Sequence, residues 1–178
     1  MERDLAKKRI KIAKIYNVPN NVDHIFYHVH SYVDESDKWE KGDRMSTEGF
    51  IKPASNNVLK DFLERVFENI RISFSADLPS RIKCLFLSDN IESVIEHNQQ
   101  VTRQLLSIKL LKGKYIRVDQ NCFNDCANGL NEKDKELMAQ CYWGGVLDDE
   151  SKSEILFEGE FEIVDDLTHF ISKFRQLT

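Results

Sequence analysis

The first clear hydrophobic run of the chain is IFYHVHSYV, residues 25–33, which is dense in aromatic and β-branched residues. This composition and length predict an interior strand. Side chains two apart on a strand point to the same face, so the two histidines are expected to lie side by side. The residues predicted on that face are Phe26, His28, His30 and Tyr32.

Hydrophobic residues before this strand recur near helical spacing within residues 3–17, RDLAKKRIKIAKIYN, and predict a short amphipathic helix. The apolar positions of this helix are Leu5, Ile10, Ile12, Ala13 and Ile15. The turn-forming segment Val18-Pro19-Asn20-Asn21 is expected to end it. We therefore expect residues 1–24 to form a helical extension, followed by one domain over residues 25–178.

A second helix is predicted over residues 55–74, where Asn56 or Asn57 is placed to cap the first turn. The apolar face expected from the spacing consists of Val58, Phe62, Val66 and Ile70. Residues 34–57, which precede or overlap its start, are polar and contain two glycines and a proline, as is typical of a long loop. Loops of this length are often functional or mobile.

The second half of the chain predicts strands interleaved with short helices. A strand is expected at residues 82–89. Two hairpins are also expected, with turns at Lys112-Gly113 and at Glu158-Gly159. Helices are expected at residues 91–100, at residues 131–145 with Asn131 at the start, and from about residue 166. The chain is therefore predicted to be an α+β protein.

Composition narrows the function classes only in part. The chain has 178 residues, of which 41% are hydrophobic, enough for one domain with its own core. Its net charge of -5 gives no general attraction to nucleic acid or to anionic membranes. No stretch approaches the roughly 20 apolar residues of a membrane span. The charged N-terminus does not match a signal peptide, so a cytoplasmic location is expected.

The cysteines are few and irregularly spaced. Cys122 and Cys126 form a C-x3-C pair, but neither Cys84 nor Cys141 adds a second pair, and no histidine lies near enough in sequence to complete a zinc site. Four cysteines do not make a disulfide scaffold in a chain of this length. We therefore expect free thiols and no metal.

Three groups of polar residues are candidates for chemistry. The pair His28 and His30 is costly to bury without a use, although a strand histidine can also be satisfied by a backbone partner. Arg81 precedes a buried run, where a guanidinium usually pairs with a carboxylate or a phosphate. Glu154 opens a strand and shares one face with Glu158, a position that is commonly exposed to solvent.

Taken in order, five short motifs resemble an uncharacterised bacterial domain family with the ADP-ribosyltransferase-like fold. The motifs are FYHVHS, a loop with W-x-x-GD, PSRIKCLFLSD, AQCYWGG and EILFEGEFEIV. The resemblance runs from about residue 25 to residue 165. It implies two small, packed, mainly antiparallel β-sheets with flanking helices, arranged around a cleft for NAD as co-substrate.

The resemblance also implies roles for particular residues. A histidine on the first core strand binds the ribose of the adenosine while nearby backbone, at Val29, holds the nicotinamide amide; His28 fits this position best and His30 is the alternative. The middle motif, which packs against the nicotinamide ribose, falls on Phe86 and Ser88. The late glutamate of the family corresponds to Glu154.

Basic residues have a further role in this interpretation, because Arg81 or Arg44 is available to bind the pyrophosphate. Lys152 stands two residues before Glu154, where family members that modify arginine carry glutamate or glutamine, so arginine is not the expected acceptor.

The function implied is transfer of ADP-ribose from NAD to a macromolecule, with protein favoured over nucleic acid as the acceptor because the chain is acidic. Small members of this fold act as toxins, phage-conflict effectors or regulators, a context in which an inhibitory partner protein is expected. The alternative is a non-catalytic module that binds NAD or a protein on the same fold. In a third interpretation His28, Arg81 and Glu154 have only structural roles.

Overall fold

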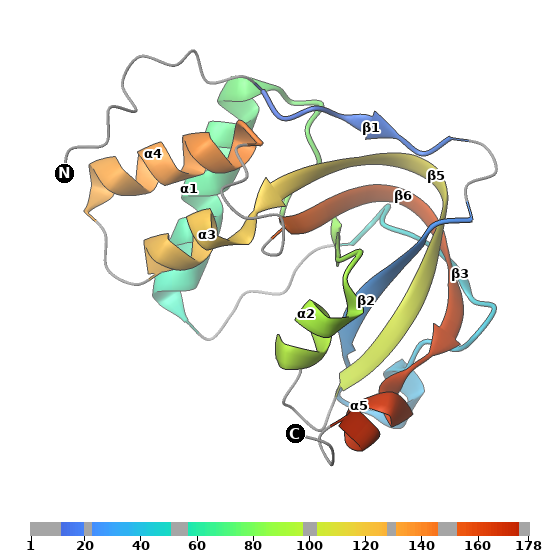
Figure 1. Ribbon diagram of the computed structural model, residues 1–178. Coiled ribbons are helices and arrows are strands. Elements are labelled where there is room, and N and C mark those ends of the chain that lie inside the picture. The colour runs from blue at the N-terminus through green and yellow to red at the C-terminus, as the bar shows by residue number, and fades with distance from the viewer. Residues whose placement is uncertain are drawn as a thin grey trace.

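The computed structural model describes residues 12–19, 23–50, 57–97, 103–127, 131–145 and 153–174. They form an α+β fold with a curled antiparallel sheet and five α-helices (Figure 1). The strands are β1 (Tyr16–Asn17), β2 (Ile25–Ser31), β3 (Arg44–Ser46), β4 (Leu85–Leu87), β5 (Arg103–Asp119) and β6 (Ser153–Asp166). The helices are α1 (Val58–Phe74), α2 (Ile91–His97), α3 (Gln120–Ala127), α4 (Glu132–Trp143) and α5 (Thr168–Phe174), with a 3-10 turn η1 (Glu35–Asp37).

The centre of the sheet is the antiparallel pair of long strands β5 and β6. β2 and β1 pair with the outer edge of β5, and β4 and β3 pair with the outer edge of β6. The sheet curls until its two edges meet, because Tyr27 of β2 and Ser88 after β4 exchange backbone hydrogen bonds of 2.7 and 2.9 Å. The predicted α+β class is therefore confirmed, but the strands form one curled sheet where two packed sheets were expected.

The two predicted hairpins are wrong, and the reason is a pair of facing glycines. Gly113 of β5 lies opposite Gly159 of β6, so each sits inside a continuous strand and not at a turn. A Cβ on Gly113 would lie 2.1 Å from the carbonyl oxygen of Glu158, and one on Gly159 would lie 2.0 Å from that of Lys112. Their φ values of 137° and 152° also disfavour other residues. Glycine thus marks a bend and a close approach of two backbones.

The helix α1 confirms a predicted element but not its predicted face. Asn57 caps it by accepting hydrogen bonds from the backbone N–H groups of Leu59 and Lys60. The buried residues of α1 are Leu63, Glu64, Phe67 and Arg71. Val58 is 83% exposed and Phe62 is 41% exposed, so the expected apolar face lies about one position away from the face that packs. The buried face of α1 therefore includes two charged residues, Glu64 and Arg71, where the hydrophobic pattern predicted only apolar side chains.

Other elements differ in detail from the sequence predictions. Residues 12–15 have no regular secondary structure and Tyr16–Asn17 form β1, so the predicted N-terminal helix is wrong there; its earlier positions Leu5 and Ile10 lie outside the described residues. The strand predicted at 82–89 is confirmed only over Leu85–Leu87. α3 was not predicted.

The remaining predicted elements agree with the structure. The helix capped by Asn131 and the C-terminal helix are confirmed, and α2 is confirmed as far as the described residues extend. Residues 34–50 form a loop interrupted by η1 and β3, and residues 51–56 lie outside the described part of the chain.

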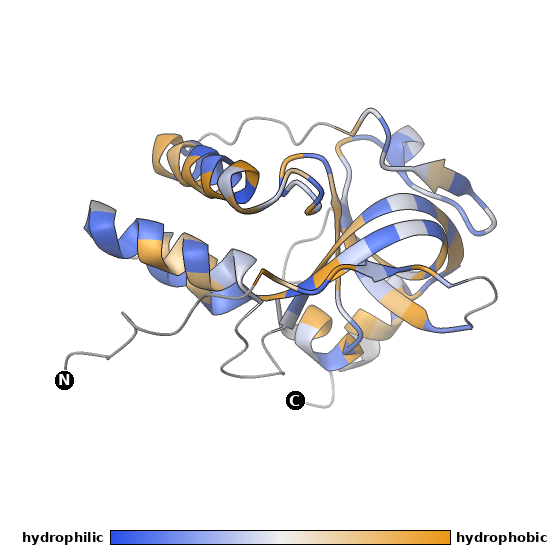
Figure 2. Ribbon diagram, turned by 90° about the horizontal axis from the view of Figure 1, so that it is seen from above, coloured by the Kyte–Doolittle hydropathy of each residue, from blue (hydrophilic) through white to orange (hydrophobic). Residues whose placement is uncertain are grey.

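Apolar side chains pack on both sides of the sheet. One cluster fills the inside of the curl, around Phe157 and Phe161, and a second lies between the sheet and the helices α1, α3 and α4, around Phe67 and Trp143. A third, smaller cluster joins α2 and α5 to β2. The strands accordingly alternate between hydrophobic and hydrophilic residues (Figure 2).

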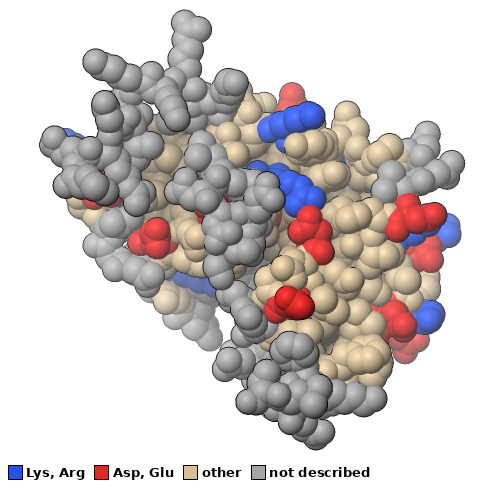
Figure 3. Space-filling model, viewed as in Figure 1, with Lys and Arg blue, Asp and Glu red and all other residues tan. Residues whose placement is uncertain are grey.

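On the face seen in Figure 3, acidic and basic side chains of the described residues are interspersed among broad areas of other residue types. No helix in the described part of the chain has the length and apolar character needed to cross a membrane.

Candidate functional site

A pocket of about 240 Å³ opens at the gap between β2 and β4, where these strands, α2 and the first residues of α3 and β6 converge. Five of the seven residues predicted for the site line it: His28, Val29, Phe86, Ser88 and Glu154. They come from three strands that are far apart in the sequence. Its volume lies just below the roughly 300–1,000 Å³ typical of small-molecule sites, so a larger ligand would extend beyond it.

His28 lies where the two edges of the sheet part. Its Nδ1 is 2.8 Å from the carbonyl oxygen of Phe86, which as an acceptor requires that Nδ1 carry the hydrogen. Burial, together with the nearby His30, lowers the pKa of His28 to about 4, although the bond to Phe86 opposes this. At neutral pH the imidazole is therefore uncharged, and its Nε2 is an acceptor.

The side chain of His28 also changes the hydrogen bonding of its neighbour. Tyr27 directs its backbone N–H and C=O toward Ser88, so Val29, two residues on, directs its own backbone groups toward the same gap. The next rung of the ladder would join Val29 to Phe86, but the Phe86 carbonyl accepts from His28. Within the described part of the chain no hydrogen bond reaches the backbone N–H or C=O of Val29. A donor and an acceptor thus stand side by side at the pocket.

His30 lies on the same face as His28, as predicted, but it is not part of the pocket lining. Its ring stacks on Trp39 with 4.1 Å between centroids, and its Nε2 is 2.9 Å from the carbonyl oxygen of Asp37. Trp39 also stacks on His28, at 5.4 Å. The side chain of Gln104 holds the backbone N–H and C=O of Trp39 at 3.0 and 3.1 Å. The pair of histidines therefore supports an aromatic stack inside the curl.

Arg81 is 4% exposed and does not line the pocket. Its Nε and Nη2 donate to the two oxygens of Glu64 at 3.0 and 3.3 Å, and its Nη1 donates to Glu154 at 2.9 Å and to the hydroxyl of Tyr142. Burial lowers the pKa of Arg81, but Tyr142, Glu154 and Glu64 outweigh it and hold the pKa above its usual range. Arg81 is thus bound to carboxylates, one of the two partners its position predicted, and it is not presented to a pyrophosphate.

Arg44, the alternative for the pyrophosphate, lies on β3, and its Nε donates to Glu162 at 2.9 Å near the surface. It does not line the pocket.

Glu154 joins the buried cluster to the pocket. Its Oε2 accepts hydrogen bonds from Arg81 and from the Tyr142 hydroxyl, each at 2.9 Å. Within the described residues no hydrogen bond reaches its Oε1. Burial raises the pKa of Tyr142 well above its ordinary value, so the phenol remains a donor. The side chain of Glu154 is 15% exposed, and not openly solvated as strand position suggested.

Sequence reasoning missed four residues at the site. Gln120 lines the pocket from the first position of α3, Ser153 from the first position of β6, and Ser93 from α2. Tyr142 was assigned to the core, which is correct, but its hydroxyl also contacts Glu154. No local signal marks these residues, because their proximity depends on how β5 pairs with β6 and on where α4 packs.

The arrangement suits an uncharged or cationic ligand that forms hydrogen bonds. Val29 offers a backbone donor and acceptor, and His28 and Glu154 are among the residues that line the pocket. Among the described residues no group of three or more histidine, cysteine or acidic side chains is arranged to hold a metal ion.

The model of a family described as "Protein of unknown function (DUF2441)" matches residues 6–169. No curated protein matches the chain.

Proposed function

The chain belongs to the DUF2441 family, and we propose that it is an NAD-dependent mono-ADP-ribosyltransferase whose active site is the pocket between β2, β4 and β6. One observation carries the proposal: His28, Val29, Phe86, Ser88 and Glu154 line a single pocket. The proposal includes an ADP-ribosyltransferase-like arrangement of the curled sheet. The acceptor is a macromolecule, with protein favoured over nucleic acid, in a toxin or phage-conflict role.

The geometry of Val29 supports binding of the nicotinamide end of NAD. A primary carboxamide has one donor and one acceptor that match a backbone C=O and N–H. Both groups of Val29 face the gap between β2 and β4. The dinucleotide is too large for a pocket of about 240 Å³, so part of it extends beyond the pocket.

Cleavage of the bond between ribose and nicotinamide requires little proton transfer by the protein. The bond between C1′ of the ribose and the nicotinamide nitrogen breaks, and its electron pair leaves with nicotinamide as a neutral amide. An acceptor nucleophile bonds to C1′ and releases its proton to solvent. The ribose passes through an oxocarbenium-like state, which a nearby carboxylate stabilises. Glu154 fits this role because Arg81 and Tyr142 fix one oxygen and leave the other without a protein donor in the described chain.

Release of nicotinamide from NAD, with and without a cell lysate as acceptor, tests the proposal. Wild-type protein is expected to release nicotinamide and to label a lysate component, and Glu154→Gln to reduce the rate by about 100-fold or more. Glu160→Gln, the same change at an exposed position of the same strand, is the matched control and retains the rate. Wild-type protein that neither binds nor cleaves NAD contradicts the proposal.

The alternative is a module that binds NAD or a protein without turnover, and the small volume of the pocket favours the protein-binding form. Calorimetry separates the two. Heat on adding NAD without release of nicotinamide indicates a sensor, and no heat indicates a protein-binding domain. His28→Ala and His30→Ala, compared in the same titration, decide which histidine contacts the nucleotide.

A further inference from the structure

The charged side chain in the pocket wall is negative. Among the described residues that line it, Glu154 is the one carboxylate, and none is a lysine or an arginine. His28 adds no positive charge, because its pKa is about 4. A ligand in the pocket therefore meets a negative side chain without a neighbouring cation in the lining.

The guanidinium behind Glu154 offsets this charge only in part. Arg81 directs Nε and Nη2 to Glu64, and a single nitrogen, Nη1, reaches Glu154. That nitrogen also contacts the Tyr142 hydroxyl. The positive charge of Arg81 is thus shared between two carboxylates, and only one of them borders the pocket.

Aromatic, aliphatic and uncharged polar residues form the rest of the pocket wall. Tyr27 and Phe86 line the pocket, and aromatic faces attract cations through their quadrupole. The guanidinium of Arg81 already lies 5.0 Å from the ring centroid of Phe86. Ser153, which also lines the pocket, has a buried hydroxyl with no hydrogen-bond partner in the described chain. A buried hydroxyl without a partner is costly, and a polar ligand would supply one.

We propose that this pocket selects a positively charged aromatic ring over a neutral ring of the same shape. The choice of a nicotinamide ring as the probe rests on the function proposed above, but the charge preference follows from the pocket wall. For the dinucleotide it means that the oxidised coenzyme, whose ring is a cation, binds in preference to the reduced one.

Two small isosteres test the proposal directly. 1-Methylnicotinamide is a cation, and 3-methylbenzamide has the same outline and carboxamide without the charge. The cation is expected to bind about tenfold more tightly in calorimetry at low salt, the advantage of one charge near a partly screened carboxylate. Glu154→Gln keeps the shape of the wall and removes its charge, so the two probes should then bind alike. Glu160→Gln should preserve the preference.

The outcomes separate this inference from the proposed function. Equal binding of the two probes to wild-type protein, or failure of the cation to bind at all, overturns the charge preference, and so does a preference that persists in Glu154→Gln. If that variant does not fold, the wild-type comparison alone decides. A clear preference for the cation without release of nicotinamide from NAD would refute the transferase and leave the cation site standing.

Discussion

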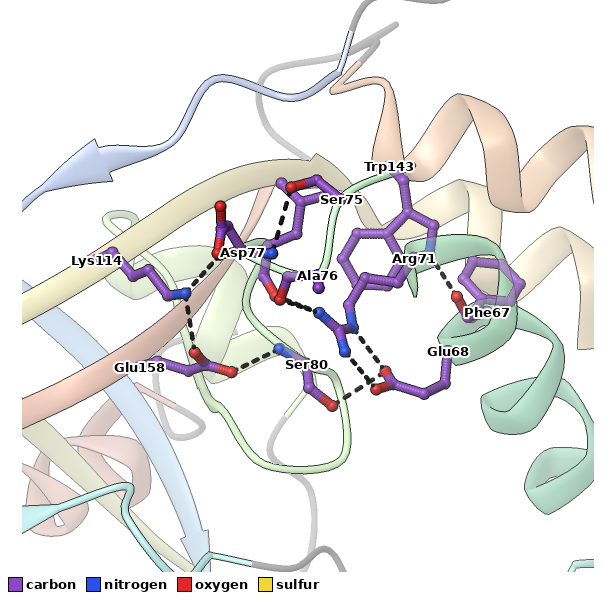
Figure 4. A network of polar contacts seen from close by, with 11 residues as sticks. Phe67, Glu68, Arg71, Ser75, Ala76, Asp77, Ser80, Lys114, Trp143 and Glu158 are labelled. Atoms are coloured by element: carbon purple, nitrogen blue, oxygen red, sulfur yellow. Dashed lines mark hydrogen bonds and ion pairs between the residues drawn. The ribbon is translucent and has the colours of Figure 1, made fainter. Parts of the chain in front are cut away.

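Arg71, on α1, and Arg81, in the segment after α1, are both buried, and each donates hydrogen bonds to a glutamate of α1. Their other partners differ. Arg71 donates to both oxygens of Glu68 and to the carbonyl oxygens of Ala76 and Leu78, all within seven residues of it (Figure 4). Arg81 instead joins Glu64, Glu154 and Tyr142, which come from α1, β6 and α4.

The surroundings of Arg71 explain what its network does. Glu68 also accepts from the Ser80 hydroxyl, and the Ser80 backbone N–H donates to Glu158, beside the glycine bend of β6 (Figure 4). The bonds of Arg71 thus hold the loop after α1 to the helix, and the bond from Ser80 to Glu158 holds the same loop to the sheet. We infer a structural role for this network.

The network of Arg81 differs because it ends at the pocket. The carboxylate of Glu154 is held on one oxygen, and Glu154 is one of the residues that line the pocket. Satisfied hydrogen bonds make a rigid anchor, whereas a group that is only partly satisfied and faces a cavity marks a place for a ligand. The comparison therefore assigns structure to one arginine and support of the candidate site to the other.

Removing each guanidinium provides the largest test of this comparison. Arg81→Met leaves two buried carboxylates without their shared cation and is expected to cost about 3–5 kcal/mol of unfolding free energy. Arg71→Met loses its bonds to Glu68 and to two backbone carbonyls and is expected to cost less, about 1.5–3 kcal/mol. Urea unfolding measures both. Equal or reversed losses would contradict the different burial and range of the two networks.

The pH dependence of stability tests the uncharged state of His28. Below pH 6.5 the unfolded chain protonates this imidazole, whereas folded His28 takes up its proton only near pH 4. The contribution to stability is therefore complete above pH 6.5 and is lost as the pH falls toward 4, on the order of 1–2 kcal/mol between pH 7 and 5. His28→Asn keeps a donor for Phe86 but does not titrate, so this part of the slope should disappear. An unchanged slope in urea titrations would argue against the assignment.

A smaller effect should separate Tyr142 from its neighbour Trp143. Both are fully buried in α4, and each donates a hydrogen bond, Tyr142 to Glu154 and Trp143 to the carbonyl oxygen of Phe67. Tyr142→Phe is expected to cost about 0.5–1.5 kcal/mol of stability and, under the proposed function, to lower kcat for NAD cleavage without raising KM. Trp143→Phe should reduce stability alone. A fall in kcat of the same size in both variants would make Tyr142 merely structural.

Local rules predicted four of the five α-helices of the described chain, although α3 was missed and the expected N-terminal helix is wrong over residues 12–17. Asn57 and Asn131 stand before runs of helix-forming residues, and a capping side chain bonds to the next few backbone groups whatever the rest of the chain does. The same is true of β2, whose aromatic and β-branched residues favour an extended backbone. Such contacts span a few residues, and the sequence displays both partners together.

The candidate site was predicted only in part. His28 and Glu154 were assigned to one pocket from a resemblance, and the structure brings them there, but Arg81 and His30 point to other partners. Gln120 and Ser153 carried no signal at all. Each of these outcomes depends on which distant strand or helix packs against the residue.

The sequence by itself determined where α1 and α4 begin, through Asn57 and Asn131, and that β2 is a strand, because these features follow from neighbours in the chain. Only the tertiary structure decided that Gly113 and Gly159 bend two continuous strands, and that Arg81 faces carboxylates inside the fold. A glycine is equally compatible with a turn and with the close approach of two backbones, and a guanidinium can pair with a carboxylate or with a phosphate. Which of these alternatives is realised depends on the segment of the chain that folding places next to the residue.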